Sequence, residues 1–348
     1  MNCPATFPLA RYRFEFQVTR PIRLPDYAGS MLRGAFGHAL RQVACLTRQP
    51  DCAGCPLAGE CPYPAVFVPT PPEQHPLQRF SEIPVPYVIE APAWGARTLD
   101  TGQVLVFHQV LIGRACQQLS LIILAWRRAL ARGVGAGDGT AELRQVVHCG
   151  DDGEDGERLI YRPEGGRIAE HRSLIRLDAP SAPVRGVTLR FITPLRLQHN
   201  GRALPPAALQ PVTLLMALAR RVSLVAEFHG DSSLPTPDFA ALKAACAALD
   251  DHKALIWRDW ARYSSRQRQA MRLGGVVGDW RLDGNLAPFA ELLRLGEWLH
   301  VGKETAFGLG QYRLCPEPPR DILAVERQNC QRPRQAIEKY LLNCERSE

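Results

Sequence analysis

The sequence predicts an α+β protein in which two similar units follow one another along the chain. Apolar and polar residues alternate in residues 10–19 and again in residues 186–193, which indicates a half-buried strand at the start of each half. Apolar residues with helical spacing follow each strand, in residues 28–44 and in residues 206–228. Residues 179–183 are rich in Pro and Ala, so we expect a linker between the halves.

Each half continues with further strands, a second helix and a last strand. In the first half, a strand in residues 102–112 leads into a helix that ends near residue 132, and residues 143–149 and 157–162 form a hairpin. The second half has the predicted helices 237–249 and 286–296 and the predicted strands 254–263, 276–282, 298–301 and 311–315. This order predicts a βαββαβ unit in each half, with helices on one face of an antiparallel sheet.

A chain of 348 residues is long enough for two hydrophobic cores. We expect a first domain in residues 1–180, a second in residues 186–316 and a helical tail in residues 317–348. A Cys-rich insertion at residues 45–67 interrupts the first domain.

Composition indicates a globular protein with a basic balance. Hydrophobic residues make up 46% of the chain and charged residues 22%. The net charge is +7, and all but four of the 42 basic residues are Arg. Arg binds phosphates with its planar fork and stacks on bases, so the bias favours a nucleic-acid partner. A GC-rich genome would also enrich Arg.

The chain shows no secretion signal at its start, and its longest apolar run, residues 119–126, is too short to cross a bilayer. We therefore expect no membrane association. Eleven Cys residues without a secretion signal argue against a disulfide framework and for a reduced, cytoplasmic setting.

Four closely spaced thiols predict a metal site. Cys45, Cys52, Cys55 and Cys61 follow the first predicted helix, and Gly and Pro residues between them supply turns. Four Cys ligands with no open position are typical of structural zinc. An iron–sulfur cluster with the same four ligands is the alternative, and four buried free thiols would be the plainer interpretation.

A glycine-rich segment near the end of the second half carries Gly302, Lys303, Gly308 and Gly310. Glycine permits positive φ and a close approach of the backbone to a ligand. Its amide groups can line a concavity for phosphate oxygens, with Lys303 adding a positive charge. The plainer interpretation is a tight turn.

Basic and aromatic residues alternate in the hairpin before this segment. Arg262, Arg266 and Arg268 lie near Trp257 and Trp260. This mixture suits phosphate neutralisation and base stacking, although the Trp residues could instead pack in the core.

Two stretches resemble a known family. Residues 255–315, with the glycine-rich segment, resemble the carboxyl-terminal domain of the CRISPR-associated endoribonucleases that cut precursor CRISPR RNA, the sixth Cas family of the RAMP superfamily. The stretch 29–40, which reads GSMLRGAFGHAL and precedes the Cys cluster, resembles the amino-terminal domain of one branch of that family.

The resemblance implies two ferredoxin-like, RRM-like domains in tandem and an enzyme that binds CRISPR repeat RNA, with other CRISPR effector subunits as further partners. It implies cleavage without a catalytic metal, in which a ribose 2′-OH attacks the adjacent phosphorus and leaves a 2′,3′-cyclic phosphate and a 5′-OH. A non-catalytic RAMP subunit that only holds crRNA is the alternative.

The same resemblance places a catalytic His on or just after the first helix, which identifies His38. Imidazole can take or supply a proton near neutral pH. We expect Tyr27 to act beside His38 as an orienting group or as an acid. His300 is the second choice for the catalytic His, because it lies at the start of the glycine-rich segment. Arg33 is expected to contact the RNA. A His on the helix surface without catalytic function is the plainer interpretation of His38.

Overall fold

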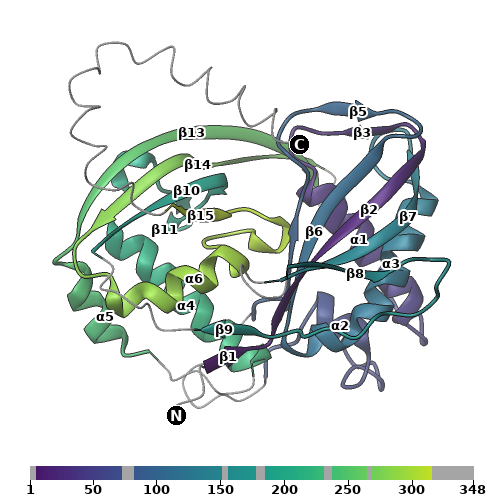
Figure 1. The fold of residues 1–348 in the computed structure, drawn as a ribbon, viewed down its shortest axis with the longest axis horizontal. Helices are drawn as coiled ribbons and strands as arrows, with labels where there is room; N and C mark the ends of the chain where they lie inside the picture. The colour runs from purple at the N-terminus through teal and green to yellow at the C-terminus, as the bar shows by residue number, and fades with distance from the viewer. Residues whose placement is uncertain are drawn as a thin grey trace.

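The computed structural model describes residues 5–72, 82–150, 156–177, 185–230, 237–264 and 269–315. Two main antiparallel sheets stand side by side, each with helices packed on one of its faces (Figure 1). None of the helices within these residues is both long and apolar enough to span a membrane. The predicted tail, residues 317–348, lies outside the described residues.

The first sheet has the strand order β4-β6-β2-β7-β8, and each neighbouring pair is antiparallel. Its strands are β2 (Leu9–Arg20), β4 (Tyr87–Glu90), β6 (Val104–Ile112), β7 (Thr140–Cys149) and β8 (Glu157–Tyr161). The helices that pack together on it are α1 (Gly29–Ala44) and α3 (Leu119–Arg132). Shorter helices precede β4 and α3, namely α2 (Pro62–Phe67) and η1 (Gly113–Gln118).

The second sheet has the order β13-β14-β10-β15. Its strands are β10 (Gly186–Leu195), β13 (Asp250–Ser264), β14 (Gln269–Asp283) and β15 (Tyr312–Cys315). Its helices are α4 (Pro211–His229), α5 (Phe239–Cys246) and α6 (Ala290–Leu299). The short helical turns are η2 (Pro206–Ala208), η3 (Ala287–Phe289) and η4 (Thr305–Phe307). The long β13–β14 hairpin arches towards the first sheet (Figure 1).

Both sheets follow one connection rule. In chain order the first unit is β2-α1-β4-β6-α3-β7 and the second is β10-α4-β13-β14-α6-β15. In each, the first strand lies between the third and the fourth. This is the predicted βαββαβ unit, so the prediction of an α+β fold with ferredoxin-like units is confirmed. Small two-stranded ribbons supplement the sheets: β1 (Ala5–Phe7) with β9 (Ile175–Leu177), β3 (Ile22–Leu24) with β5 (Arg97–Leu99), and β11 (Gln198–His199) with β12 (Arg202–Ala203).

The two units share a contact because the second core continues onto the first sheet. Leu9, Val88 and Val110, on β2, β4 and β6, belong to the same buried cluster as Leu293 and Trp298 of α6. The face of the first sheet that α1 and α3 leave open is thus partly covered by the second unit. Burial of these side chains stabilises that contact by about 1.5–3 kcal/mol for each fully buried aliphatic residue.

One predicted element is wrong. Residues 298–301 were expected to form a strand, but α6 continues to Leu299. Trp298 and Leu299 are buried together with Leu295 at helical spacing, so they belong to the apolar stripe of α6. The helix stops at His300, whose φ of 59° is left-handed.

Candidate functional site

The glycine loop, residues 302–310, lies where the two units meet. Its three glycines have positive φ, at 95° for Gly302, 94° for Gly308 and 70° for Gly310. The space around Gly308 is filled by the first unit, because a Cβ there would lie 2.5 Å from the Ile89 carbonyl oxygen and 2.5 Å from the Tyr27 hydroxyl. The backbone at Gly308 therefore does lie close to another group, as the sequence predicts, but that group belongs to the first unit of the same chain and not to a ligand.

Hydrogen bonds inside the protein occupy much of this loop. The N–H of Lys303 donates to the Arg196 carbonyl at 2.9 Å, that of Gly308 to Thr305 at 2.9 Å, and that of Gly310 to Pro194 at 3.0 Å. Gly308 and Gly310 are also buried. Their amides are therefore not available to a phosphate group, which corrects the expected phosphate cradle at these two residues. The Lys303 side chain is exposed and stays available.

Tyr27 packs in the same contact. It is 4% exposed, and its hydroxyl donates to the Phe307 carbonyl at 2.7 Å. Its ring stacks on Trp94 with centroids 5.0 Å apart and meets the edge of Trp260 at 5.2 Å. Burial raises the pKa of Tyr27 above its ordinary value, and the nearby Glu90 carboxylate adds to that. The structure gives Tyr27 a packing role, and an acid role in contact with substrate does not fit its burial.

His300 is fully buried, and its Nε2 lies 3.2 Å from Oε1 of Glu90 on β4. The same carboxylate oxygen accepts a hydrogen bond from Nη2 of Arg11 at 2.9 Å. Burial lowers the pKa of His300, an effect that Glu90 partly opposes. Burial would raise the pKa of Glu90, but Arg11 and His300 outweigh it and hold that pKa well below its usual range. These three side chains form a buried network between the units, which argues against His300 as a group that touches substrate.

His38 differs from Tyr27 and His300 because it is exposed. It lies on α1 nine residues after Gly29, about 14 Å along the helix from the end that abuts the glycine loop. No hydrogen bond with another described residue fixes its ring. Arg33, one helical turn and a half earlier, is half-buried, with its guanidinium 4.6 Å over the Phe67 ring. His38 is therefore the one predicted catalytic residue that solvent reaches.

The predicted basic hairpin is described only in part. Arg262 lies on β13, but its side chain is outside the described ones, and Arg266 and Arg268 lie outside the described residues. Among the aromatics, Trp260 is 6% exposed and packs in the contact between the units. Trp257 is 37% exposed, and its indole N–H donates to Asp259 at 2.9 Å. The core interpretation therefore fits Trp260, while Trp257 keeps an accessible face.

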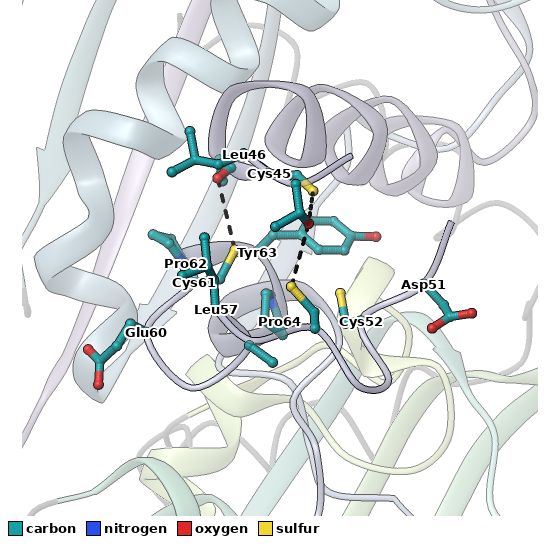
Figure 2. A pocket seen from close by; sticks show the side chains of 14 residues that line it. Cys45, Leu46, Asp51, Cys52, Leu57, Glu60, Cys61, Pro62, Tyr63 and Pro64 are labelled. Carbon is teal, nitrogen blue, oxygen red and sulfur yellow. Dashed lines mark hydrogen bonds between the residues drawn. The ribbon is translucent and has the colours of Figure 1, made fainter. Parts of the chain in front are cut away.

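The four Cys residues lie around one cavity of about 210 Å³ at the carboxyl end of α1 (Figure 2). Their donor set, four thiols, is the one expected for zinc. The thiols do not converge as a coordination shell: no group of three or more His, Cys, Asp or Glu in the described part of the chain is placed to hold an ion. The four thiols are thus suitable ligands for a metal, but their present positions do not form a coordination shell.

Sequence reasoning missed Arg11, Glu90 and Trp94. Glu90 is 210 positions from His300 and 79 from Arg11, so no local pattern could join them. Trp94 stacks on Tyr27 with Arg258 at 5.1 Å over its ring, and it lies in an irregular segment without periodicity. A signal did exist for Glu90, since a carboxylate next to three apolar strand residues, Tyr87 to Ile89, suggests a buried charge with a partner.

Two family models match the sequence. The one described as CRISPR-associated endoribonuclease Cas6 matches residues 189–312, from β10 to the start of β15, which includes the glycine loop. The other, AF_1859_N, is described as an N-terminal domain and matches residues 7–173. No curated protein matches the chain at a significant level.

Solved structures with a similar fold include a Cas6 product complex, at 17% identity and a TM-score of 0.54 over 88% of this chain and 99% of that one. Thermus thermophilus Cas6 is 15% identical, with a TM-score of 0.49 over 90% of this chain and 100% of that one. A partial Cas6-RT-Cas1–Cas2 complex is 14% identical, with a TM-score of 0.53 over 90% of this chain and 47% of that one. At these identities, the two similarities with TM-scores above 0.5 show the fold alone.

Proposed function

We propose that this chain is a member of the CRISPR-associated endoribonuclease Cas6 family, whose model matches residues 189–312, and that it cuts CRISPR repeat RNA to mature crRNA. The observation that carries the proposal is the extent of that match. It covers the second βαββαβ unit, in which the glycine loop joins α6 to β15. The similar folds of a Cas6 product complex and of part of a chain in a partial Cas6-RT-Cas1–Cas2 complex support it.

We propose cleavage by transesterification without a catalytic metal. The ribose 2′-OH loses its proton and attacks the adjacent phosphorus, and the 5′ oxygen leaves and takes up a proton. His38 is the proposed acid or base, because it is exposed on α1 and an imidazole can exchange a proton near neutral pH. Tyr27 and His300 support this site indirectly, by fixing the contact between the two units.

RNA binding is proposed for Lys303, for Arg33 and for the three Arg residues of the hairpin. Lys303 extends from the glycine loop into solvent, and Arg33 lies on the same helix as His38. Arg262, Arg266 and Arg268 remain proposed phosphate contacts on the hairpin. Lys and Arg release counterions when they neutralise phosphates, so binding should weaken steeply with salt. Other CRISPR effector subunits are proposed as further partners.

One observation favours a second function, that of a crRNA-binding subunit that does not cut. Within the part of the chain that the structure describes, no hydrogen bond orients the His38 ring, whereas a general acid or base usually needs a fixed position. Catalytic hydrogen bonds often form only when substrate binds, so the enzyme is the better-supported proposal.

The decisive experiment incubates the purified protein with end-labelled repeat RNA in a brief EDTA treatment. Cleavage should continue and give 2′,3′-cyclic phosphate and 5′-OH ends. A repeat with a 2′-deoxy nucleotide at the cut site should bind and stay intact, because the nucleophile is missing. Binding without any cleavage of the all-ribose repeat would support the non-catalytic subunit instead.

His38→Ala tests the assignment of the acid or base. We expect single-turnover cleavage to slow roughly 10²-fold, with RNA affinity nearly unchanged. His199→Ala is the matched control, because His199 is also exposed but lies at the end of β11, in the second unit. Equal rates for the two variants would remove His38 from the mechanism.

A further inference from the structure

The Cys residues after α1 have no part in the proposed RNA chemistry, yet they surround a single cavity. Cys45 directly follows α1 as its C-cap, and Cys61 directly precedes α2 as its N-cap. Cys52 and Cys55 lie in the turns between them, and all four thiols line the cavity. The loop therefore brings together four soft ligands from the ends of two helices and from the segment that joins them.

Contacts around the cavity link the thiols to one another. The Thr47 hydroxyl lies 3.9 Å from Sγ of Cys45 and 3.5 Å from Sγ of Cys55, so it stands between two of them. Sγ of Cys61 lies 3.9 Å from the carbonyl oxygen of Ala44, the residue just before Cys45. These contacts place the Thr47 hydroxyl and the Ala44 carbonyl next to three of the four thiols.

Backbone turns and one basic residue hold the loop in this shape. The Cys55 N–H donates to the Cys52 carbonyl at 3.3 Å, and the Cys61 N–H donates to Leu57 at 2.9 Å. Arg41 of α1 donates to the carbonyls of Gln49 and Pro50. Four thiolates on a divalent ion carry a net negative charge, which a nearby guanidinium offsets.

The carboxylates near the cavity do not compete with the thiols. Asp51 and Glu60 also line it, but Figure 2 shows both carboxylates pointing away from the sulfur atoms. Oδ1 of Asp51 accepts a hydrogen bond from the Ala53 N–H at 3.0 Å. A site with only sulfur ligands selects zinc or an iron–sulfur cluster over magnesium or calcium, which prefer oxygen.

We propose that Cys45, Cys52, Cys55 and Cys61 together bind one zinc ion that fixes the corner between α1 and α2. Metal binding would draw the open thiols into a tetrahedron and add folding free energy to the loop. The position of α2 relative to α1 matters because the two helices pack together. The Phe67 ring of α2 occupies the space next to Gly37 of α1 and stacks on Tyr63. The ion would have a structural role, since four protein ligands leave no open position for substrate.

The first test measures metal content. The full chain, purified with reductant and without chelator, should contain about one zinc per chain by elemental analysis. Cys52→Ser and Cys55→Ser should each lose most of that zinc. Cys315→Ser is the control, because Cys315 is a free, partly exposed thiol on β15, and it should keep the metal. Cobalt in place of zinc should give the visible absorption of tetrahedral thiolate coordination in the wild type and in Cys315→Ser, and not in Cys52→Ser or Cys55→Ser.

Stability gives a second, independent measurement. A zinc-specific chelator should lower the melting temperature of the wild type, and added zinc should restore it, whereas Cys55→Ser should respond to neither. Iron with sulfide in the purified protein, or disulfides among these four residues, would overturn the zinc assignment. So would a wild type that contains no zinc and takes up none on titration.

Discussion

Gly308 provides a sharp test of how the two units are held together. The sequence alone suggests that a side chain there would weaken RNA binding without affecting stability. The structure predicts a loss of stability instead, because Gly308 faces the first unit. The proposed change is Gly308→Ala, the smallest substitution that adds a Cβ.

Two costs add up at this position. A φ of 94° is rarely adopted by a residue with a Cβ, and holding one there costs about 1–3 kcal/mol. The Cβ would also lie 2.5 Å from a backbone oxygen and from the buried Tyr27 hydroxyl. Overpacking of this kind costs about 1–3 kcal/mol, since the backbone atom cannot rotate away. The combined loss of about 2–6 kcal/mol is a large part of an ordinary unfolding free energy of about 5–15 kcal/mol.

Gly102→Ala separates the two costs. Gly102 has nearly the same φ, 91°, but no heavy atom lies within 4 Å of its Cβ position. The control therefore carries the backbone cost without the clash. By thermal denaturation, we expect Gly308→Ala to melt roughly 2–12 °C below Gly102→Ala, because the clash of about 1–3 kcal/mol corresponds to about 2–4 °C for each kcal/mol. Equal melting temperatures would refute the packing argument and restore the glycine loop as an open surface.

Further predictions follow from the buried network and from Lys303. His300 has a lowered pKa in the folded state, so the unfolded chain binds more protons below about pH 6.5 and stability is lost as the pH falls through that value. The melting temperature should decrease between pH 7.5 and 5.5, less so in His300→Gln; equal pH profiles for the variant and the wild type would contradict a contribution from His300. Lys303→Ala should weaken repeat-RNA binding and reduce the slope against salt by about one counterion, while Lys243→Ala, an exposed Lys on α5, should not. If both Lys variants bind like the wild type at several salt concentrations, Lys303 does not contact phosphate.

Much of the fold could be predicted because periodicity reports which face of an element is buried. Leu32, Phe36 and Leu40 share the buried stripe of α1, as their spacing predicts. The same rule failed at residues 298–301, where Trp298 and Leu299 fit a helix and a strand equally well over so few positions. The segment before β4 carries no period, so neither α2 nor β4 was predicted as an element.

The site was less predictable because exposure depends on the other unit. Glycines in residues 302–310 were singled out correctly for positive φ, but the sequence does not say whether the close neighbour is a ligand or protein. In the structure that neighbour is Ile89, more than two hundred positions earlier. Glu90 and His300 meet through the same long-range contact, so their pairing was invisible to any local pattern.

Exposure divides the predicted catalytic residues into two groups with different expected effects. Tyr27 and His300 are buried between the units, so changing them should act first on stability and only then on RNA. His38 is exposed on α1, so changing it should act on cleavage with little effect on melting. Because His38 lies about 14 Å along α1 from the helix end that abuts the glycine loop, the effects of the two groups should be close to additive. A double variant, His38→Ala with Gly308→Ala, should therefore show the cleavage defect of the first and the melting temperature of the second. Strong non-additivity would mean that the contact between the units positions His38, and that the chemistry and the packing form one site.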